Sequence, residues 1–133
     1  MGRVLIADPQ WPEKAFEGRK DEIRPCVACS QGCTDMVFQA QPVFCVGNPC
    51  AGFETQRKIE KTASPKKVMV IGAGAAGLEA AVTAAMIGHD VEVYDRDSDI
   101  GGQIWIAGAP PHKRELLEFI RYYRAMIRKH RIK

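Results

Sequence analysis

The chain has 133 residues, 46% of them hydrophobic, and a formal net charge of +3. This length holds one ordinary domain or two small pieces of larger ones, and so small a positive surplus argues against nucleic acid as a partner. No stretch approaches the ~18 apolar residues of a membrane helix and the first residues lack the features of a signal peptide, so we expect a cytoplasmic protein without a membrane partner.

Residues 1–25 form the first predicted segment. The apolar run Val4–Ala7 is typical of a short buried strand. Asp8-Pro9 would end that strand, because an Asp-Pro pair favours a turn. Mixed charges and two further prolines follow, which indicate irregular structure for the rest of the segment.

Residues 26–53, the second segment, hold all five cysteines. Glycines and prolines are frequent among them, which indicates a loop-rich segment that needs a covalent or metal staple. The spacing of the first four cysteines is Cys26-x2-Cys29-x3-Cys33-x11-Cys45. In the reducing cytosol, where disulfides are rare, such cysteines indicate metal ligands or redox groups.

Three interpretations of the cysteines stay open from spacing alone. Three cysteines close together and a fourth after a short excursion suit the compact four-thiolate core of an iron–sulfur cluster. Zinc also accepts four thiolates, usually from two separated Cys-x2-Cys pairs, but here Cys50 follows Cys45 at x4. A structural or disulfide role is the third interpretation. Cys50 is either an alternative to Cys45 or a small buried hydrophobic residue.

From Lys67 onward the chain has the pattern of an α/β fold, after a polar and charged linker at residues 54–66. A run of β-formers, a glycine-rich turn, an alanine-rich helix and a second strand are expected at 68–71, 72–77, 78–87 and 90–95. They predict a β-α-β unit, which takes ~30 residues. Residues 67–133 are therefore interpreted as part of a Rossmann-like nucleotide-binding domain.

The turn at residues 72–77, Gly-Ala-Gly-Ala-Ala-Gly, matches the G-x-G-x-x-G pattern between a strand and a helix. Gly72 would permit the tight turn, Gly74 the approach of a pyrophosphate, and Gly77 close packing of helix on strand. The helix N-terminus would offer free amides to the phosphates. Asp95, 18 residues after Gly77, suits a ribose 2′-hydroxyl and disfavours a 2′-phosphate. FAD, ADP or NAD therefore fits better than NADP.

Two features follow the second strand. The segment Ile100-Gly-Gly-Gln103 has two glycines that allow backbone to pass close to a ligand, and a surface turn explains it equally well. A final helix at Lys113–His130 has apolar residues spaced by four, three and four, and a basic last turn. No third strand is visible after it, and no residue is a good candidate for catalytic proton or hydride transfer.

Four strings together are similar to a known family: Ile23-Arg-Pro-Cys-Val-Ala-Cys-Ser-Gln-Gly-Cys33, Cys45-Val-Gly-Asn-Pro49, Lys67-Val-Met-Val-Ile-Gly-Ala-Gly-Ala-Ala-Gly-Leu-Glu79 and Ile100-Gly-Gly-Gln103. In this order they resemble the NADH:flavin oxidoreductases with an iron–sulfur cluster, which include 2,4-dienoyl-CoA reductase and trimethylamine dehydrogenase. The resemblance covers essentially the whole chain. Residues 118–124 resemble the reductase branch more than the amine dehydrogenase branch.

Members of this family have an FMN-binding TIM barrel, a [4Fe–4S] cluster after it, and an FAD- or ADP-binding domain with an inserted NAD(P)H domain. The resemblance implies that residues 1–25 are the C-terminal edge of the barrel, 26–53 the cluster loop and 67–133 a partial FAD/ADP-binding domain. The implied cluster ligands are Cys26, Cys29, Cys33 and Cys45. The implied FAD or ADP contacts are Gly72, Gly74, Gly77, Asp95, Gly102 and Gln103. Gly2 and Arg3 would help to bind the FMN phosphate.

The implied function is the electron-relay portion of such an enzyme, from NAD(P)H to FAD, to the cluster, to FMN and an enoyl- or dienoyl-type substrate. Most of the barrel and the NAD(P)H domain are absent, so FMN would bind only with the missing barrel. We expect either a fragment or one subunit of a split enzyme with a barrel-containing partner. The alternatives are the relay segment of an amine dehydrogenase or N-demethylase, and a non-catalytic zinc- or nucleotide-binding module.

Overall fold

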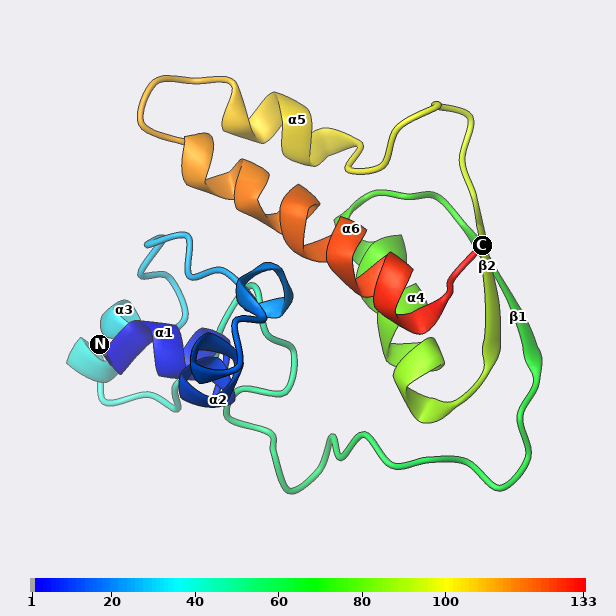
Figure 1. The fold of residues 1–133 in the computed structure, drawn as a ribbon. Coiled ribbons are helices and arrows are strands. Elements are labelled where there is room, and N and C mark those ends of the chain that lie inside the picture. The colour runs from blue at the N-terminus through cyan, green and yellow to red at the C-terminus, as the bar shows by residue number, and fades with distance from the viewer. Residues whose placement is uncertain (1) are drawn as a thin grey trace. The chain divides into compact units, whose positions relative to one another are not determined.

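The structure is a computed structural model that describes residues 2–133, so the first residue of the predicted barrel-end segment lies outside it. The chain divides into two compact parts, which we call unit 1, up to Lys58, and unit 2, from Ile59 (Figure 1). None of the helices in the described part combines the length and the apolar character that crossing a bilayer requires.

Unit 1 consists of short helices joined by turns and loops. Its elements are α1 (Gly2–Ala7), α2 (Trp11–Phe16), the 3₁₀ helix η1 (Lys20–Glu22) and α3 (Thr34–Phe38). Its described residues form no strand, only an isolated antiparallel bridge between Cys45 and Asn48. Two of its buried residues are polar, Asp8 and Asn48. Buried polar groups of this kind are held by hydrogen bonds, so unit 1 depends on a polar interior.

The predicted strand at Val4–Ala7 is wrong, because these residues lie in helix α1. The N–H of Asp8 donates to the carbonyl of Val4 at 2.8 Å, which extends the helical bonding by one residue. A strand without neighbours leaves its backbone donors and acceptors unpaired, whereas a helix satisfies them locally. The predicted end of this element is confirmed, since the helix stops before Asp8-Pro9.

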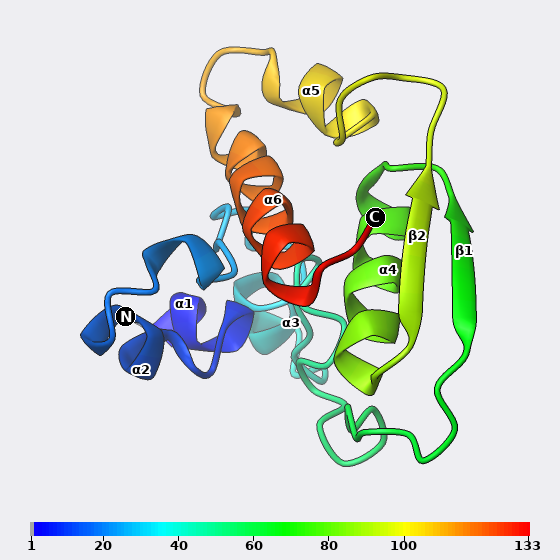
Figure 2. The same cartoon turned by 45° about the vertical axis from the view of Figure 1, so that its right-hand side comes forward.

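Unit 2 is a small α/β fold with two parallel strands (Figure 2). Its elements are β1 (Lys67–Ile71), α4 (Ala75–Ile87), β2 (Asp90–Tyr94), α5 (Gln103–Gly108), the 3₁₀ helix η2 (Arg114–Leu117) and α6 (Glu118–His130). The register places Val68 opposite Val91 and Val70 opposite Val93. Helix α4 connects the two strands, which confirms the predicted order of strand, helix and strand.

The core of unit 2 is formed by α4 and α6 together with one face of the sheet. Leu78 and Val82 of α4 and Ile120 of α6 are at most 2% exposed. Removing each of these side chains from water contributes about 1.5–3 kcal/mol. The hydroxyl of Tyr123 also donates to the carboxylate of Glu79 at 3.0 Å, which links α6 to α4. This packing fixes the start of α4, where the glycine-rich turn lies.

Lys133 pairs with β2. Its N–H donates to the carbonyl of Val91 at 3.1 Å, and its carbonyl accepts the N–H of Val93 at 2.6 Å. In a parallel ladder, the N–H of one residue bonds to one residue of the neighbouring strand, and its C=O bonds to the residue two positions further along that strand. The backbone after α6 therefore returns along β2 in the direction of the strand, a feature that the sequence did not predict.

Candidate functional site

The cysteines of unit 1 that were predicted as ligands lie on two stretches of chain, which we call the arms. The first arm comprises residues 24–33 and the second arm residues 44–48. Neither arm is regular apart from the bridge at Cys45. The first arm contains Cys26, Cys29 and Cys33, and the second arm contains Cys45.

The two arms are hydrogen-bonded to each other at both ends. At one end the N–H of Phe44 donates to the carbonyl of Gly32 at 2.7 Å. At the other end the guanidinium Nη1 of Arg24 donates to the carbonyl of Gly47 at 2.6 Å. A Cβ on Gly32 would lie 2.5 Å from the carbonyl oxygen of Phe44, so the arms approach more closely than a side chain there would allow.

The four thiols on the arms are free, and all except that of the exposed Cys29 are half-buried. Within residues 2–133, no three or more cysteine, histidine, aspartate or glutamate side chains are gathered as a bound metal ion requires. Thiols lose their protons when a metal binds, so a bound metal group would be held by thiolates. The donor set nonetheless fits a four-thiolate group, because the arms that hold these cysteines are already joined.

Cys50 differs from the other four cysteines. Its Sγ donates to the carbonyl of Arg57 at 3.4 Å, and its backbone N–H donates to the side chain of Asn48 at 3.1 Å. It is half-buried and hydrogen-bonded, so it is not the small buried hydrophobic residue considered from the sequence. A thiol engaged with a carbonyl outside the arms is a poor candidate for a fourth ligand.

The glycine-rich turn of unit 2 has three glycines in different environments. Gly72 has φ of 104°, a conformation that L residues rarely adopt, and its N–H donates to the carbonyl of Tyr94 at 2.7 Å. A Cβ on Gly77 would lie 1.9 Å from the carbonyl oxygen of Gly72, so no side chain fits between helix and turn. A Cβ on Gly74 would meet nothing within 4 Å. The backbone at Gly74 is therefore open to a ligand.

Asp95 lies at the carboxyl end of β2, across from this turn. Its Oδ1 accepts the N–H of Asp97 at 2.9 Å, and its Oδ2 accepts the N–H of Ala73 at 2.5 Å. These backbone donors, from Asp97 and then Ala73, hold the pKa of the Asp95 carboxyl below its usual range. An open depression of about 360 Å³ lies beside it, and its lining comprises Ile71, Gly72, Tyr94, Asp95 and Arg96.

The second glycine pair lies against the first turn. The N–H of Gly101 donates to the carbonyl of Ala73 at 2.8 Å, and Gly101 forms a parallel bridge with Gly74. A Cβ on Gly102 would lie 3.3 Å from the Cα of Gly74, whereas Gln103 is exposed at the start of α5. The structure therefore brings Gly72, Gly74, Gly77, Asp95 and Gly102 to one place in unit 2, with Gln103 beside them.

Gly2 and Arg3 lie at the start of α1 and are exposed. The guanidinium Nη1 of Arg3 donates to the hydroxyl of Ser30 at 3.2 Å. Ser30 follows Cys29 in the first arm, so Arg3 lies next to the cysteine-bearing part of unit 1. No short sequence pattern predicts this contact, because the two residues are 27 positions apart.

Comparisons with known proteins find relatives that match nearly the whole chain. Residues 55–107 match the family model of the C-terminal domain of alanine dehydrogenase/PNT. A metal reductase of Desulforamulus reducens is 46% identical over 122 residues, which are 92% of this chain and 18% of that protein. The solved structure of a 2-naphthoyl-CoA reductase with 2-naphthoyl-CoA is 42% identical, with a TM-score of 0.95 over 98% of this chain and 20% of that chain. These matches confirm the resemblance to NADH:flavin oxidoreductases that was predicted from the sequence, for a chain that aligns with one segment of longer proteins.

The solved structure of an amine oxidase is less similar to this chain. The 6-hydroxypseudooxynicotine amine oxidase of Pseudomonas geniculata is 33% identical, with a TM-score of 0.84 over 95% of this chain and 20% of that chain. The chain thus spans about a fifth of the length of the relatives it matches. Its likeness to these oxidoreductases extends over both units, since 98% of the chain aligns with the reductase.

Proposed function

We propose that this chain supplies the electron-relay segment of an iron–sulfur flavoprotein oxidoreductase. The observation that supports it most is the double hydrogen bonding of the two arms, which holds four free thiols on one small unit of the chain. When bound, a [4Fe–4S] cluster and a flavin would supply one-electron and two-electron redox chemistry. The residues of this chain would bind and orient these groups.

In this proposal Cys26, Cys29, Cys33 and Cys45 hold the cluster. The backbone N–H groups of the first arm would tune it, because hydrogen bonds to cluster sulfurs shift the reduction potential. Ala28 and Ser30, on either side of Cys29, have φ of 52° and 60°. Successive turns of this kind direct backbone N–H groups into a concavity that favours negative charge.

The glycine-rich turn of unit 2 would hold the adenosine diphosphate of FAD, in a partial Rossmann-like domain. The open backbone at Gly74 admits the pyrophosphate, and the ionised Asp95 accepts a ribose hydroxyl. Gly102 and Gln103 border the same turn. A carboxylate beside the ribose repels a 2′-phosphate, which favours FAD or ADP over NADP.

We propose an enoyl- or dienoyl-type substrate for the whole enzyme. The reductase that acts with 2-naphthoyl-CoA is closer to this chain than the amine oxidase, in identity and in TM-score. In the less favoured alternative, the relay segment of an amine dehydrogenase or N-demethylase, electrons would leave the substrate flavin through this chain. In both cases the FMN-binding barrel and the NAD(P)H domain come from elsewhere, with Gly2 and Arg3 at the barrel edge.

A barrel-containing partner or a longer version of this chain would supply the substrate pocket. Intact-mass measurement of the native protein and co-purification from its source would distinguish them. A stable complex with a separate barrel subunit supports a split enzyme, and a single longer chain supports a fragment.

Metal analysis tests the proposed cluster directly. The chain, purified or reconstituted without oxygen, should contain about four irons and as much sulfide per molecule, with a broad visible absorbance. One zinc per molecule and no iron after the same treatment would instead support the zinc-binding module. A chain that contains neither iron nor zinc after this treatment would refute the proposed electron-relay function.

Replacing Asp95 by asparagine should weaken ADP binding about tenfold and reduce the preference for ADP over its 2′-phosphorylated form, as measured by calorimetric titration. Because backbone N–H groups lower the pKa of Asp95, its carboxylate stays ionised above the ordinary aspartate pKa of ~3.9 and is neutralised only as the pH falls through the lowered value. The affinity ratio of wild type to variant should therefore be constant between about pH 8 and pH 5.

The matched control for this prediction is Asp97→Asn, two residues further along the chain. The carboxylate of Asp97 is exposed, and its Oδ1 lies 4.0 Å from Nε of Arg96 in a long ion pair. ADP affinity should be unchanged in this variant. Equal losses in Asp95→Asn and Asp97→Asn would mean that general negative charge, rather than the position of Asp95, controls binding.

A further inference from the structure

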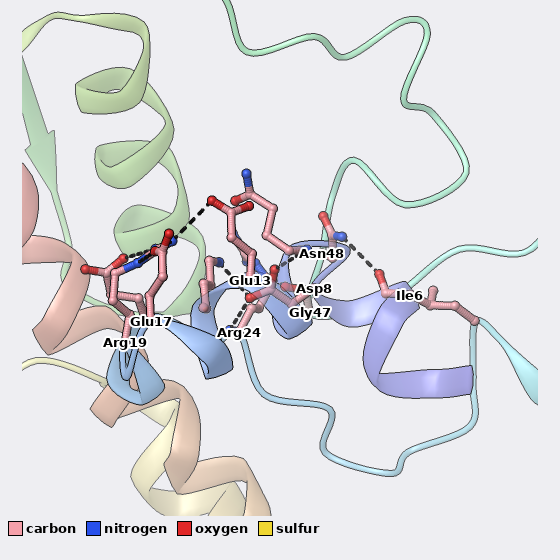
Figure 3. Close-up of polar contacts among 11 residues, drawn as sticks. Ile6, Asp8, Glu13, Glu17, Arg19, Arg24, Gly47 and Asn48 are labelled. Carbon is pink, nitrogen blue, oxygen red and sulfur yellow. Dashed lines mark hydrogen bonds and ion pairs between the residues drawn. The ribbon is translucent and has the colours of Figure 1, made fainter. Parts of the chain in front are cut away.

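The interior of unit 1 contains two buried polar side chains, Asp8 and Asn48, which are 4% and 8% exposed. An aspartate is almost never buried unless it is paired, and a buried amide loses free energy unless it is hydrogen-bonded. The bonds that these two side chains make lead to the two cysteine arms. Figure 3 shows Asp8 and Asn48 together with Ile6, Arg24 and Gly47.

Asp8 joins the beginning of the first arm to the end of α1. Its Oδ2 accepts the backbone N–H of Arg24 at 2.8 Å and the ammonium of Lys14 at 2.7 Å, and its Oδ1 accepts the N–H of Gln10 at 3.1 Å. Lys14 balances the buried charge from within the unit. The Arg24 backbone bond therefore fixes the chain two residues before Cys26, where the first arm begins.

The bonding continues from Arg24 to the second arm. The Arg24 guanidinium donates to the carbonyl of Gly47, two residues after Cys45. Next to Gly47, the side-chain amide of Asn48 donates to the carbonyl of Ile6 at 3.0 Å. Both arms are thus attached to α1 and the residues just after it, one through Asp8 and the other through Asn48.

We propose that Asp8 and Asn48 are positioning residues that hold the two cysteine arms together before a cluster is bound. This inference rests on the proposed function, because it assigns the arms to a cluster. The physical reason is conformational entropy: fixing one residue's backbone costs about 1–2 kcal/mol, so a loop that is already ordered loses less free energy when its thiolates gather around a metal. Groups behind the ligands commonly affect metal affinity by about 10- to 100-fold.

The first test measures amide hydrogen exchange in the metal-free full chain. Asp8→Ala alone would leave the ammonium of Lys14 buried without its partner, so the variant is the pair Asp8→Ala with Lys14→Met. The matched control is Asp8→Asn with Lys14→Met, because the asparagine oxygen can still accept the N–H of Arg24. We expect exchange at the amides of Arg24, Cys26 and residues 44–48 to rise at least about tenfold in the alanine pair and less than about threefold in the asparagine pair.

Asn48→Ala provides a second, independent variant. It removes the bonds to Ile6 and to the N–H of Cys50, and leaves Asp8 intact. Exchange should rise at the amides of residues 44–48 and Cys50, and stay unchanged at those of Arg24 and Cys26. Far-UV circular dichroism and exchange in unit 2 serve as controls for the overall fold. Equal exchange in wild type and in all variants would overturn the proposal, and so would the lack of any protection at residues 44–48 in wild type.

The second test uses the reconstituted protein and an iron chelator. Loss of the visible absorbance should be about 10- to 100-fold faster in the alanine pair and in Asn48→Ala than in wild type, and close to wild type in the asparagine pair. Identical rates in all proteins would overturn the positioning role while leaving the cluster in place. A wild-type chain that takes up no iron would refute the proposed function instead, and the exchange experiment still decides whether Asp8 and Asn48 order the arms.

Discussion

Gly77→Ala should lower the free energy of unfolding of unit 2 by about 3 kcal/mol. The added methyl group would lie 1.9 Å from the carbonyl oxygen of Gly72 and 3.4 Å from the side chain of Val70. The first of these atoms belongs to the backbone of the turn, so relief requires α4 to move away from β1. Urea unfolding followed by far-UV circular dichroism would measure the loss, because α4 and α6 give most of the helical signal of this unit.

Gly74→Ala is the matched control, since it is the same substitution three residues earlier. A Cβ on Gly74 meets nothing within 4 Å, and its backbone, at φ −79° and ψ −178°, is extended and open to any residue. The free energy of unfolding should change by less than about 0.5 kcal/mol. ADP affinity should fall, however, because the methyl group would occupy the open space where a pyrophosphate would lie. Equal destabilisation by both substitutions would contradict the close-packing role of Gly77.

Cys29→Ser should abolish the broad visible absorbance of the reconstituted chain and reduce its iron content from about four atoms to fewer than about one. Cys29 is exposed and lies at the middle of the first arm, and a serine hydroxyl is a far weaker ligand than a thiolate. Iron and sulfide analysis, together with the absorption spectrum, would measure the effect.

Cys50→Ser is the control for Cys29→Ser, because it makes the same chemical change in the same unit. The thiol of Cys50 donates to the carbonyl of Arg57, and a serine hydroxyl can do the same. Iron content and absorbance should stay at the wild-type level. An unchanged spectrum in Cys29→Ser, or its loss in Cys50→Ser, would mean that the ligand set is wrong.

The order of elements in unit 2 could be predicted because its signals are local. The glycine spacing, the alanine-rich helix and the β-formers on either side lie within residues 68–95, and each favours the same strand–helix–strand structure. The position of Asp95 next to the turn followed from this order, since the carboxyl ends of parallel strands meet at one edge. Its hydrogen bond with Ala73 agrees with that expectation.

The interior of unit 1 could not be predicted in the same way. Asn48 bonds to Ile6 from 42 residues away, and Asp8 to Arg24 from 16 residues away, so no short pattern links these partners. The sequence shows Asp8 only as part of a turn signal. The apolar run Val4–Ala7 looks the same in a strand and in a short helix, and the lack of neighbouring strands in the described part of unit 1 decided between them.

The pairing of Lys133 with β2 has a practical consequence for making this protein. Residues fused directly after Lys133 would continue parallel to β2. There they could pair with further backbone N–H and C=O groups on that side of the strand. An affinity tag attached there without a spacer would start as an artificial strand and offer a new edge for aggregation. A flexible glycine-serine spacer, or a tag at the opposite terminus, keeps that edge as it is.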